Sequence, residues 1–184
     1  IKRFDKYAKD LAITMNKKIN PIVFEGDDVY FDEHAYKDLI KGFVELVGNA
    51  IEHGIEFPAD RYRNNKAEYG TLKLTVTRNE KDILLRFEDD GRGVDVNKVK
   101  DILYEQKRLP FDEIVALEDD AVAQYIFTEG LTTNFLTKSN TSKGMGLFML
   151  KEKLDQIGGR IGVHTVFNGY TVFEVTVPMR EQMK

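Results

Sequence analysis

An acidic residue at the end of an alternating segment is the first candidate for chemistry. The segment DILLRFED alternates as a β-strand does. Its residues Ile83, Leu85 and Phe87 share one apolar face at the two-residue period. Asp89 continues that face, whereas Asp90 points the other way. A buried carboxylate is costly without hydrogen-bond donors, so Asp89 predicts nearby donors from the backbone, water or a ligand.

Two glycines follow this carboxylate. Gly91 and Gly93 flank Arg92, and backbone without side chains can turn sharply or approach a flat ligand closely. Acidic residues and glycines are also common in ordinary turns, so their spacing alone leaves both interpretations open. Because Asp89 lies on the apolar, inward face of its strand, we favour the interpretation that this segment binds a ligand.

A polar stripe on a predicted long helix is the second candidate. Glu45 and Asn49 are one turn apart, and Glu52 and His53 follow one turn later. Carboxylate and amide oxygens in this arrangement could hold Mg²⁺, which prefers hard oxygen ligands, and a solvated helix face is the alternative. Asparagine is a mediocre helix former, so its presence at position 49 in mid-helix suggests that the side chain has a functional role.

A glycine-containing loop and a strand threonine complete the candidates. Lys143, Gly144 and Gly146 precede a helix predicted to begin near Leu147, where free N–H groups and the helix dipole could bind phosphate. The loop lacks the GxxxxGK[ST] spacing of a Walker loop, and a purely structural loop is the alternative. Thr171 shares a face with apolar strand residues, so its hydroxyl either binds a partner or belongs to an ordinary strand threonine.

Alternating helices and strands must position these residues. The pattern predicts a single α/β domain over residues 1–184, in which 1–18 form an amphipathic helix that could link it to a preceding domain. Further helices are predicted at 33–53, 96–107, 119–127 and 147–157, and strands at 21–25, 29–31, 71–77, 82–89, 160–166 and 170–178. The residues between 54 and 70 read as a loop, and Asn168-Gly169 predicts a tight turn in the last hairpin.

Composition excludes several classes of protein. The chain has 27 Lys+Arg against 31 Asp+Glu and a formal net charge of −4, which argues against a nucleic-acid partner. It has no cysteine, which excludes a disulfide scaffold and a thiolate metal cluster. No apolar run approaches the roughly 20 residues of a membrane-spanning helix, so we expect a cytoplasmic location without direct membrane contact.

Taken in order, four segments resemble the motifs of the ATP-binding superfamily that includes gyrase, heat-shock chaperones, histidine kinases and mismatch-repair proteins. They are ELVGNAIEHG for the N box, DDGRG for the first glycine box, IFTEGLTT for the phenylalanine box and SKGMGL for the second glycine box. The segments NAIEHGIE, DDGRGVD and IGGRIGV are most similar to the catalytic domain of CheA-type chemotaxis histidine kinases. The resemblance covers nearly the whole chain. It implies a two-layer α/β sandwich of Bergerat type, in which helices cover one face of a mixed, mostly antiparallel sheet.

The resemblance also implies roles for the candidate residues. Asp89 would accept a hydrogen bond from the adenine amino group of ATP, supported by Thr171 and a water, and Asn49 would coordinate Mg²⁺ at the phosphates. The other residues of the implied nucleotide site are His53, Gly91, Gly93, Lys143, Gly144 and Gly146, with residues 128–143 as a lid.

Two positions depart from the CheA pattern. Glu45 stands where CheA-like kinases tend to carry histidine, whereas ATP-hydrolysing relatives have a glutamate that activates water; Ser142 replaces a glycine. Glu45 and Asn49 are therefore the candidate catalytic residues, and three functions stay open. They are transfer of the γ-phosphate of Mg–ATP to a histidine, ATP hydrolysis with Glu45 as base, and nucleotide sensing or partner binding without chemistry.

The sequence has three histidines, His34, His53 and His164. None of them has the sequence surroundings of a phosphoacceptor histidine. The leading hypothesis therefore requires a phosphoacceptor histidine on a separate domain, in the same parent chain or in trans. We expect the parent protein to dimerise through another segment and this piece to be monomeric alone.

Overall fold

The computed structural model describes residues 2–28, 37–131 and 146–179. The helices of the described chain are α1 Lys2–Thr14, α2 Lys37–Asn49, the π-helix η1 Ala50–Gly54, α3 Pro58–Arg63, α4 Val96–Glu105, α5 Phe111–Ala116, α6 Asp119–Ala123, the 3₁₀-helix η2 Gln124–Phe127 and α8 Leu147–Gln156. The strands are β1 Val23–Gly26, β2 Leu72–Arg78, β3 Asp82–Asp89, β4 Arg160–Val166 and β5 Tyr170–Pro178. None of the described helices is long and apolar enough to cross a bilayer.

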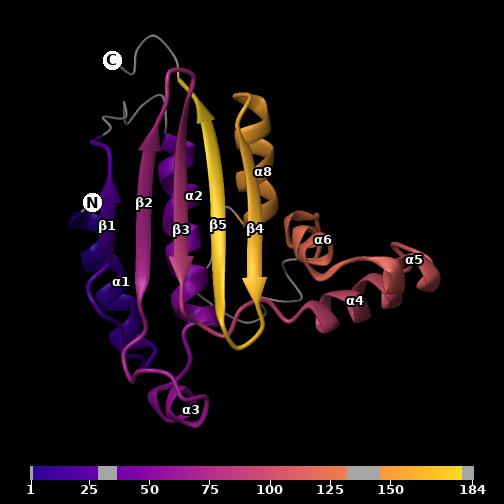
Figure 1. Ribbon diagram of the computed structural model, residues 1–184, viewed down its shortest axis with the longest axis horizontal. Coiled ribbons are helices and arrows are strands. Elements are labelled where there is room, and N and C mark those ends of the chain that lie inside the picture. The colour runs from indigo at the N-terminus through magenta and orange to yellow at the C-terminus, as the bar shows by residue number, and fades with distance from the viewer. Residues whose placement is uncertain (1, 29–36, 132–145, 180–184) are drawn as a thin grey trace.

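The strands form one five-stranded sheet in the order β1-β2-β3-β5-β4 (Figure 1). The β1–β2 pair is parallel, and the other three pairs are antiparallel. This confirms the predicted mixed, mostly antiparallel sheet. β3 lies at its centre, between β2 and β5, so the strand that ends in Asp89 has a hydrogen-bonded neighbour on both sides.

Helices α1, α2 and α8 lie across one face of the sheet in Figure 1. Side chains of β3 alternate between buried and half-buried along its whole length, as the two-residue period predicts. The half-buried set carries charge: Arg86 contacts both Glu88 and Glu174. One face of the sheet is therefore apolar and covered by helices and the other is polar, which confirms the two-layer α/β sandwich.

Aromatic contacts join the two layers. The Phe43 ring of α2 meets Phe87 of β3 edge-on with centroids 5.3 Å apart, and meets Phe4 of α1 at 5.1 Å. Helices α2 and α8 approach closely because Gly42 has no side chain; a Cβ there would lie 2.2 Å from Leu150 Cδ1. The helix that carries the polar stripe is thus fixed against both the sheet and its helical neighbours.

The outer side of β4 meets a side chain from η2. The amide group of Gln124 donates from Nε2 to the Val163 carbonyl at 2.7 Å and accepts from the Val163 N–H at 3.3 Å. These are the two bonds that a neighbouring peptide group would make.

Several predicted boundaries need correction. The segment 54–70 is not a plain loop, because Pro58 begins the short helix α3. Helix α1 ends at Thr14, before Lys18, and a further helix, α5, follows α4. The last hairpin turns through three residues, 167–169, rather than through Asn168-Gly169 alone. The predicted strand at 29–31 and most of the predicted lid at 128–143 lie outside the described residues.

Candidate functional site

Asp89 is buried at the inner end of β3, with a side chain that is 2% exposed. Its Oδ1 atom accepts a hydrogen bond from the Gly91 N–H at 3.0 Å. Burial raises the pKa of Asp89 to about 7, and this N–H opposes the rise. Thr171 is its Cα partner on β5 and is also buried. The predicted carboxylate and hydroxyl therefore lie side by side, as their strand phases indicate.

The glycine loop after β3 packs against the end of the long helix. A Cβ at Gly91 would lie 2.4 Å from the Gly54 carbonyl carbon, and a Cβ at Gly54 would lie 2.9 Å from Asp89 Oδ1. The Arg92 N–H donates to the Gly54 carbonyl at 2.9 Å. Gly93 has φ +70, a conformation that side chains rarely adopt. Gly54 is thus a third glycine of the site, which the sequence analysis did not single out.

The long helix changes pitch where it reaches this loop. After Asn49 the chain forms the π-helix η1, whose first carbonyl, that of Ala50, accepts from the Ile55 N–H at 2.6 Å. Short π-helical segments often occur at functional sites. Within the described residues, Nδ2 of Asn49 is a buried side-chain nitrogen without a hydrogen-bond partner. A buried donor without a partner is available to donate a hydrogen bond to an acceptor atom of a bound ligand.

Lys17 supports the end of this helix. Its ammonium group donates to the carbonyls of Ile51 at 2.6 Å and of Glu52 at 2.7 Å, and lies 5.5 Å from the centroid of the Phe57 ring. Burial lowers the pKa of Lys17 to about 8. Terminal helix carbonyls need donors, and a cation near them also complements the helix dipole. Lys17 thereby stabilises the turn that carries His53.

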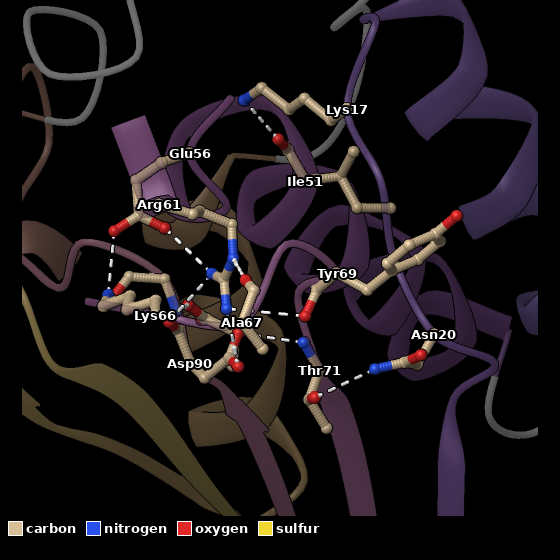
Figure 2. A network of polar contacts seen from close by, with 12 residues as sticks. Lys17, Asn20, Ile51, Glu56, Arg61, Lys66, Ala67, Tyr69, Thr71 and Asp90 are labelled. Carbon is tan, nitrogen blue, oxygen red and sulfur yellow. Dashed lines mark hydrogen bonds and ion pairs between the residues drawn. The ribbon is translucent and has the colours of Figure 1, made fainter. Parts of the chain in front are cut away.

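A second polar network holds the glycine loop from behind (Figure 2). Arg61 of α3 is 1% exposed and donates to Glu56 Oε2 at 3.0 Å and to Asp90 Oδ2 at 2.9 Å. Lys66 donates to Glu56 Oε1 at 2.8 Å and to the Gly91 carbonyl at 2.6 Å. Figure 2 shows the Arg61 guanidinium between Glu56 and Asp90. The network fixes the backbone beside Asp89, and Glu56, Arg61 and Lys66 all lie in the segment 54–70 that was predicted to be a loop.

These elements enclose a cavity of about 570 Å³. It brings together five of the predicted residues: Asn49, His53, Asp89, Gly93 and Thr171. Its apolar lining comes from Ala50, Val94, Ile126, Leu147, Phe167 and Phe173. Gly91 is not part of the lining and instead packs behind Asp89. Burial lowers the pKa of His53, against the opposing charge of Glu52.

The remaining predicted residues are placed differently. Glu45 does not line the cavity; burial and the charge of Glu52 raise its pKa, and it in turn helps to raise the pKa of Tyr7 on α1. Gly146 precedes α8, whose first residue Leu147 lines the cavity, and a Cβ at Gly146 would meet no atom of the described residues within 4 Å. Lys143 and Gly144 lie outside the described residues.

The cavity suits a nucleotide carried with a divalent cation. Its described lining has more acidic than basic side chains: Glu52, Glu56, Asp60, Asp89 and Asp95 against Arg63, Arg92 and Lys98. Arg61 and Lys66 neutralise Glu56, and Arg63 pairs with Asp60, so the net acidic charge of the described lining is smaller than this count suggests. The described residues hold no cluster of three or more His, Cys, Asp or Glu side chains that could bind a metal by themselves. Mg²⁺ typically uses few protein ligands together with substrate phosphates; the amide oxygen of Asn49 is the kind of ligand it prefers, and Nδ2, without a partner among the described residues, is free to donate to a phosphate.

Comparisons with known proteins agree with this geometry. Residues 35–181 match the family model of histidine kinase-, DNA gyrase B-, and HSP90-like ATPases. The chain is 29% identical over 177 residues to chemotaxis protein CheA of Halobacterium salinarum, covering 96% of this chain and 26% of that protein. It is 29% identical over 178 residues to chemotaxis protein CheA of Treponema pallidum, covering 96% of this chain and 21% of that protein. The chain thus spans about a quarter of the length of these relatives.

Solved structures share the fold at lower identity. The mycobacterial sensor histidine kinase MprB superimposes with a TM-score of 0.53 at 13% identity, covering 96% of this chain and 92% of that one. The histidine kinase domain of the Erythrobacter litoralis EL346 blue-light activated histidine kinase gives 0.52 at 16% identity, covering 97% and 60%. With the family model matching most of its length, the chain belongs to the histidine kinase-, DNA gyrase B-, and HSP90-like ATPase family and is an ATP-binding domain.

Proposed function

We propose that this domain binds Mg–ATP and transfers the γ-phosphate to a histidine on a separate domain or chain. The observation that carries the proposal is one cavity that holds both the buried carboxylate of Asp89 and the unpartnered amide nitrogen of Asn49. The similarity to chemotaxis protein CheA supports the choice of histidine as acceptor. Parent-protein dimerisation, a cytoplasmic location and the absence of nucleic-acid and membrane contact remain part of the same proposal.

The residues of the cavity have distinct parts in this function. Asp89 in its ionised form accepts from the adenine amino group, and Thr171 beside it holds a second hydrogen bond or a water at the same edge. Asn49 and His53 lie one helical turn apart on the segment that would face the phosphates. Mg²⁺, when bound, neutralises phosphate charge. Asn49 orients the phosphates through its amide, so that the γ-phosphorus can be approached in line.

The transfer needs little covalent chemistry from this chain. An imidazole nitrogen of the acceptor forms a bond to the γ-phosphorus, the bond from that phosphorus to the ADP oxygen breaks, and the imidazole proton passes to solvent. We propose this reaction rather than hydrolysis with Glu45 as base because of the similarity to chemotaxis protein CheA. We propose that Lys143, Gly144 and Gly146 add phosphate contacts before α8.

The direct test mixes the purified chain, γ-labelled ATP and candidate helical phosphoacceptor domains from its parent chain or operon. Label should appear on a histidine as an acid-labile phosphoramidate, and Asp89→Asn should abolish it. Glu45→Gln separates the two reactions, since it should leave transfer intact. If the wild type releases inorganic phosphate without labelling any acceptor, and Glu45→Gln stops that release, hydrolysis replaces transfer as the function.

A further inference from the structure

An aromatic side chain outside the predicted motifs reaches the same cavity. Phe167 lies in the three-residue turn between β4 and β5, and it lines the cavity while remaining 52% exposed. A large apolar side chain that is about half exposed at the rim of a ligand cavity is available to cover a ligand surface.

The turn that carries Phe167 is fastened to the glycine loop. The Asn168 N–H donates to the Arg92 carbonyl at 2.6 Å, and the Val94 N–H donates to Thr165 Oγ1 at 2.8 Å. A Cβ at Gly93 would lie only 2.3 Å from the Val166 carbonyl oxygen. Phe167 is therefore held in a defined place relative to the loop that begins at Asp89.

The shape and chemistry of the cavity select what Phe167 would touch. Asp89 and Thr171 offer polar atoms, which would be used at the edge of a planar base. The faces of such a base need apolar neighbours, and the buried Ile126 and Phe173 and the half-buried Val94 supply them. Phe167 adds an aromatic ring from the solvent side, where a stacked or edge-on contact with the base would also cover the ring.

We propose that Phe167 is a specificity-determining residue that packs against the nucleobase face and so makes affinity depend on an aromatic base. This inference rests on the proposed function, because it needs a nucleotide whose base is held by Asp89. It predicts that Phe167 contributes to the binding affinity for ATP but not to the affinity for a ligand that consists of phosphate groups alone.

The first experiment titrates wild type and Phe167→Ala with Mg–ATP and, separately, with magnesium tripolyphosphate. Phe167→Ala should weaken ATP binding about tenfold, the scale of one base–aromatic stacking contact, and leave tripolyphosphate binding unchanged. Phe167→Tyr should restore ATP affinity. Phe111→Ala is the matched control, because Phe111 on α5 is 61% exposed and does not line the cavity.

The second experiment uses the absence of tryptophan from the sequence. Phe167→Trp places a single reporter in the turn, and its fluorescence should change on adding ATP but not on adding tripolyphosphate. Phe111→Trp should respond to neither. This readout does not depend on a change in affinity.

Two results would overturn the inference: ATP affinity of Phe167→Ala within twofold of wild type, or equal losses for ATP and tripolyphosphate. Asp89→Asn in the same titration separates the two proposals. If wild type binds ATP, Asp89→Asn does not, and Phe167→Ala binds normally, only the role of Phe167 fails. If wild type binds no ATP at all, both fail.

Discussion

The Asp89 residue is 2% exposed, and its carboxylate accepts a hydrogen bond from the Gly91 N–H, so the role proposed for it in binding comes with a cost in folding stability. Its pKa is about 7 in the folded protein against a usual value of 3.8. Between these values the folded state binds more protons than the unfolded state, so stability falls as pH rises through this window. Above about pH 7 the buried group is ionised and can accept from an amino group.

We therefore expect Asp89→Asn to be more stable than wild type at pH 8, while the difference shrinks towards pH 4. Inside the window the wild type should lose about 1.4 kcal/mol per pH unit relative to the variant. Urea unfolding of both proteins from pH 4 to 8 measures this difference. A constant difference across the range would show that Asp89 does not titrate there.

Single-residue reasoning from the sequence predicted Asp89 and Thr171 because strand alternation fixes which face a residue occupies, and neither strand contains a bulge that would reset the phase. Asn49 was predicted because its position in the helix is unfavourable without a use. Phe167 gave no such signal, since turn composition drew attention to Asn168 and Gly169. Spacing along the helix also does not reveal that Glu45 raises the pKa of Tyr7 on α1, because that effect depends on how the two helices pack.

Among the elements, α3 is short, yet it holds Arg61 at the centre of the network behind the glycine loop. We expect Arg61→Met to lower the free energy of unfolding by about 3 kcal/mol or more, because the Glu56 carboxylate would keep only part of its charge compensation. Arg63→Met is the control: Arg63 is on the same helix, its side chain is 74% exposed, and within the described part of the chain its ion pair is with the exposed Asp60.

Arg63→Met should change stability by less than about 1 kcal/mol, as exposed pairs do. Urea denaturation of both variants beside wild type makes the comparison. Equal effects of the two substitutions would mean that the buried network contributes no more to stability than a surface ion pair.

The long helix and the β2–β3 and β4–β5 hairpins follow from local pattern, and each was predicted. Helix α3 was missed because PADRYR is too brief to show helical periodicity, although Pro58 at its start is a helix signal. The π-helical turn has no sequence signature, and the parallel pairing of β1 with β2 joins segments separated by about fifty residues along the chain. Both depend on tertiary contacts, among them the Lys17 bonds to the helix end.

For the molecule as a whole, the role proposed for Asn49 links ligand binding to folding. A ligand at about 100 times its dissociation constant stabilises a folded protein by about 2.7 kcal/mol. Without ligand, Asn49→Ala should be at least as stable as wild type, since it removes a buried donor that has no partner in the described chain. With Mg–ATP it should gain less stability than wild type does.

Removing Mg²⁺ with EDTA tests whether the metal acts at Asn49. We expect the ATP-dependent rise in thermal midpoint of wild type to fall to the level of Asn49→Ala, and the smaller rise of the variant to stay unchanged. A thermal melt with and without EDTA measures both. If EDTA lowers the rise equally in the two proteins, the metal is held elsewhere.

The bonds between Gln124 and Val163 also affect how this protein behaves at high concentration. A sheet edge with unpaired peptide groups can add a strand from another molecule, and such pairing leads to aggregation. Here one side-chain amide occupies both peptide groups of Val163 on the outer side of β4. A second copy could not continue the ladder through that point without first displacing Gln124, so this bond pair favours solubility of the folded domain.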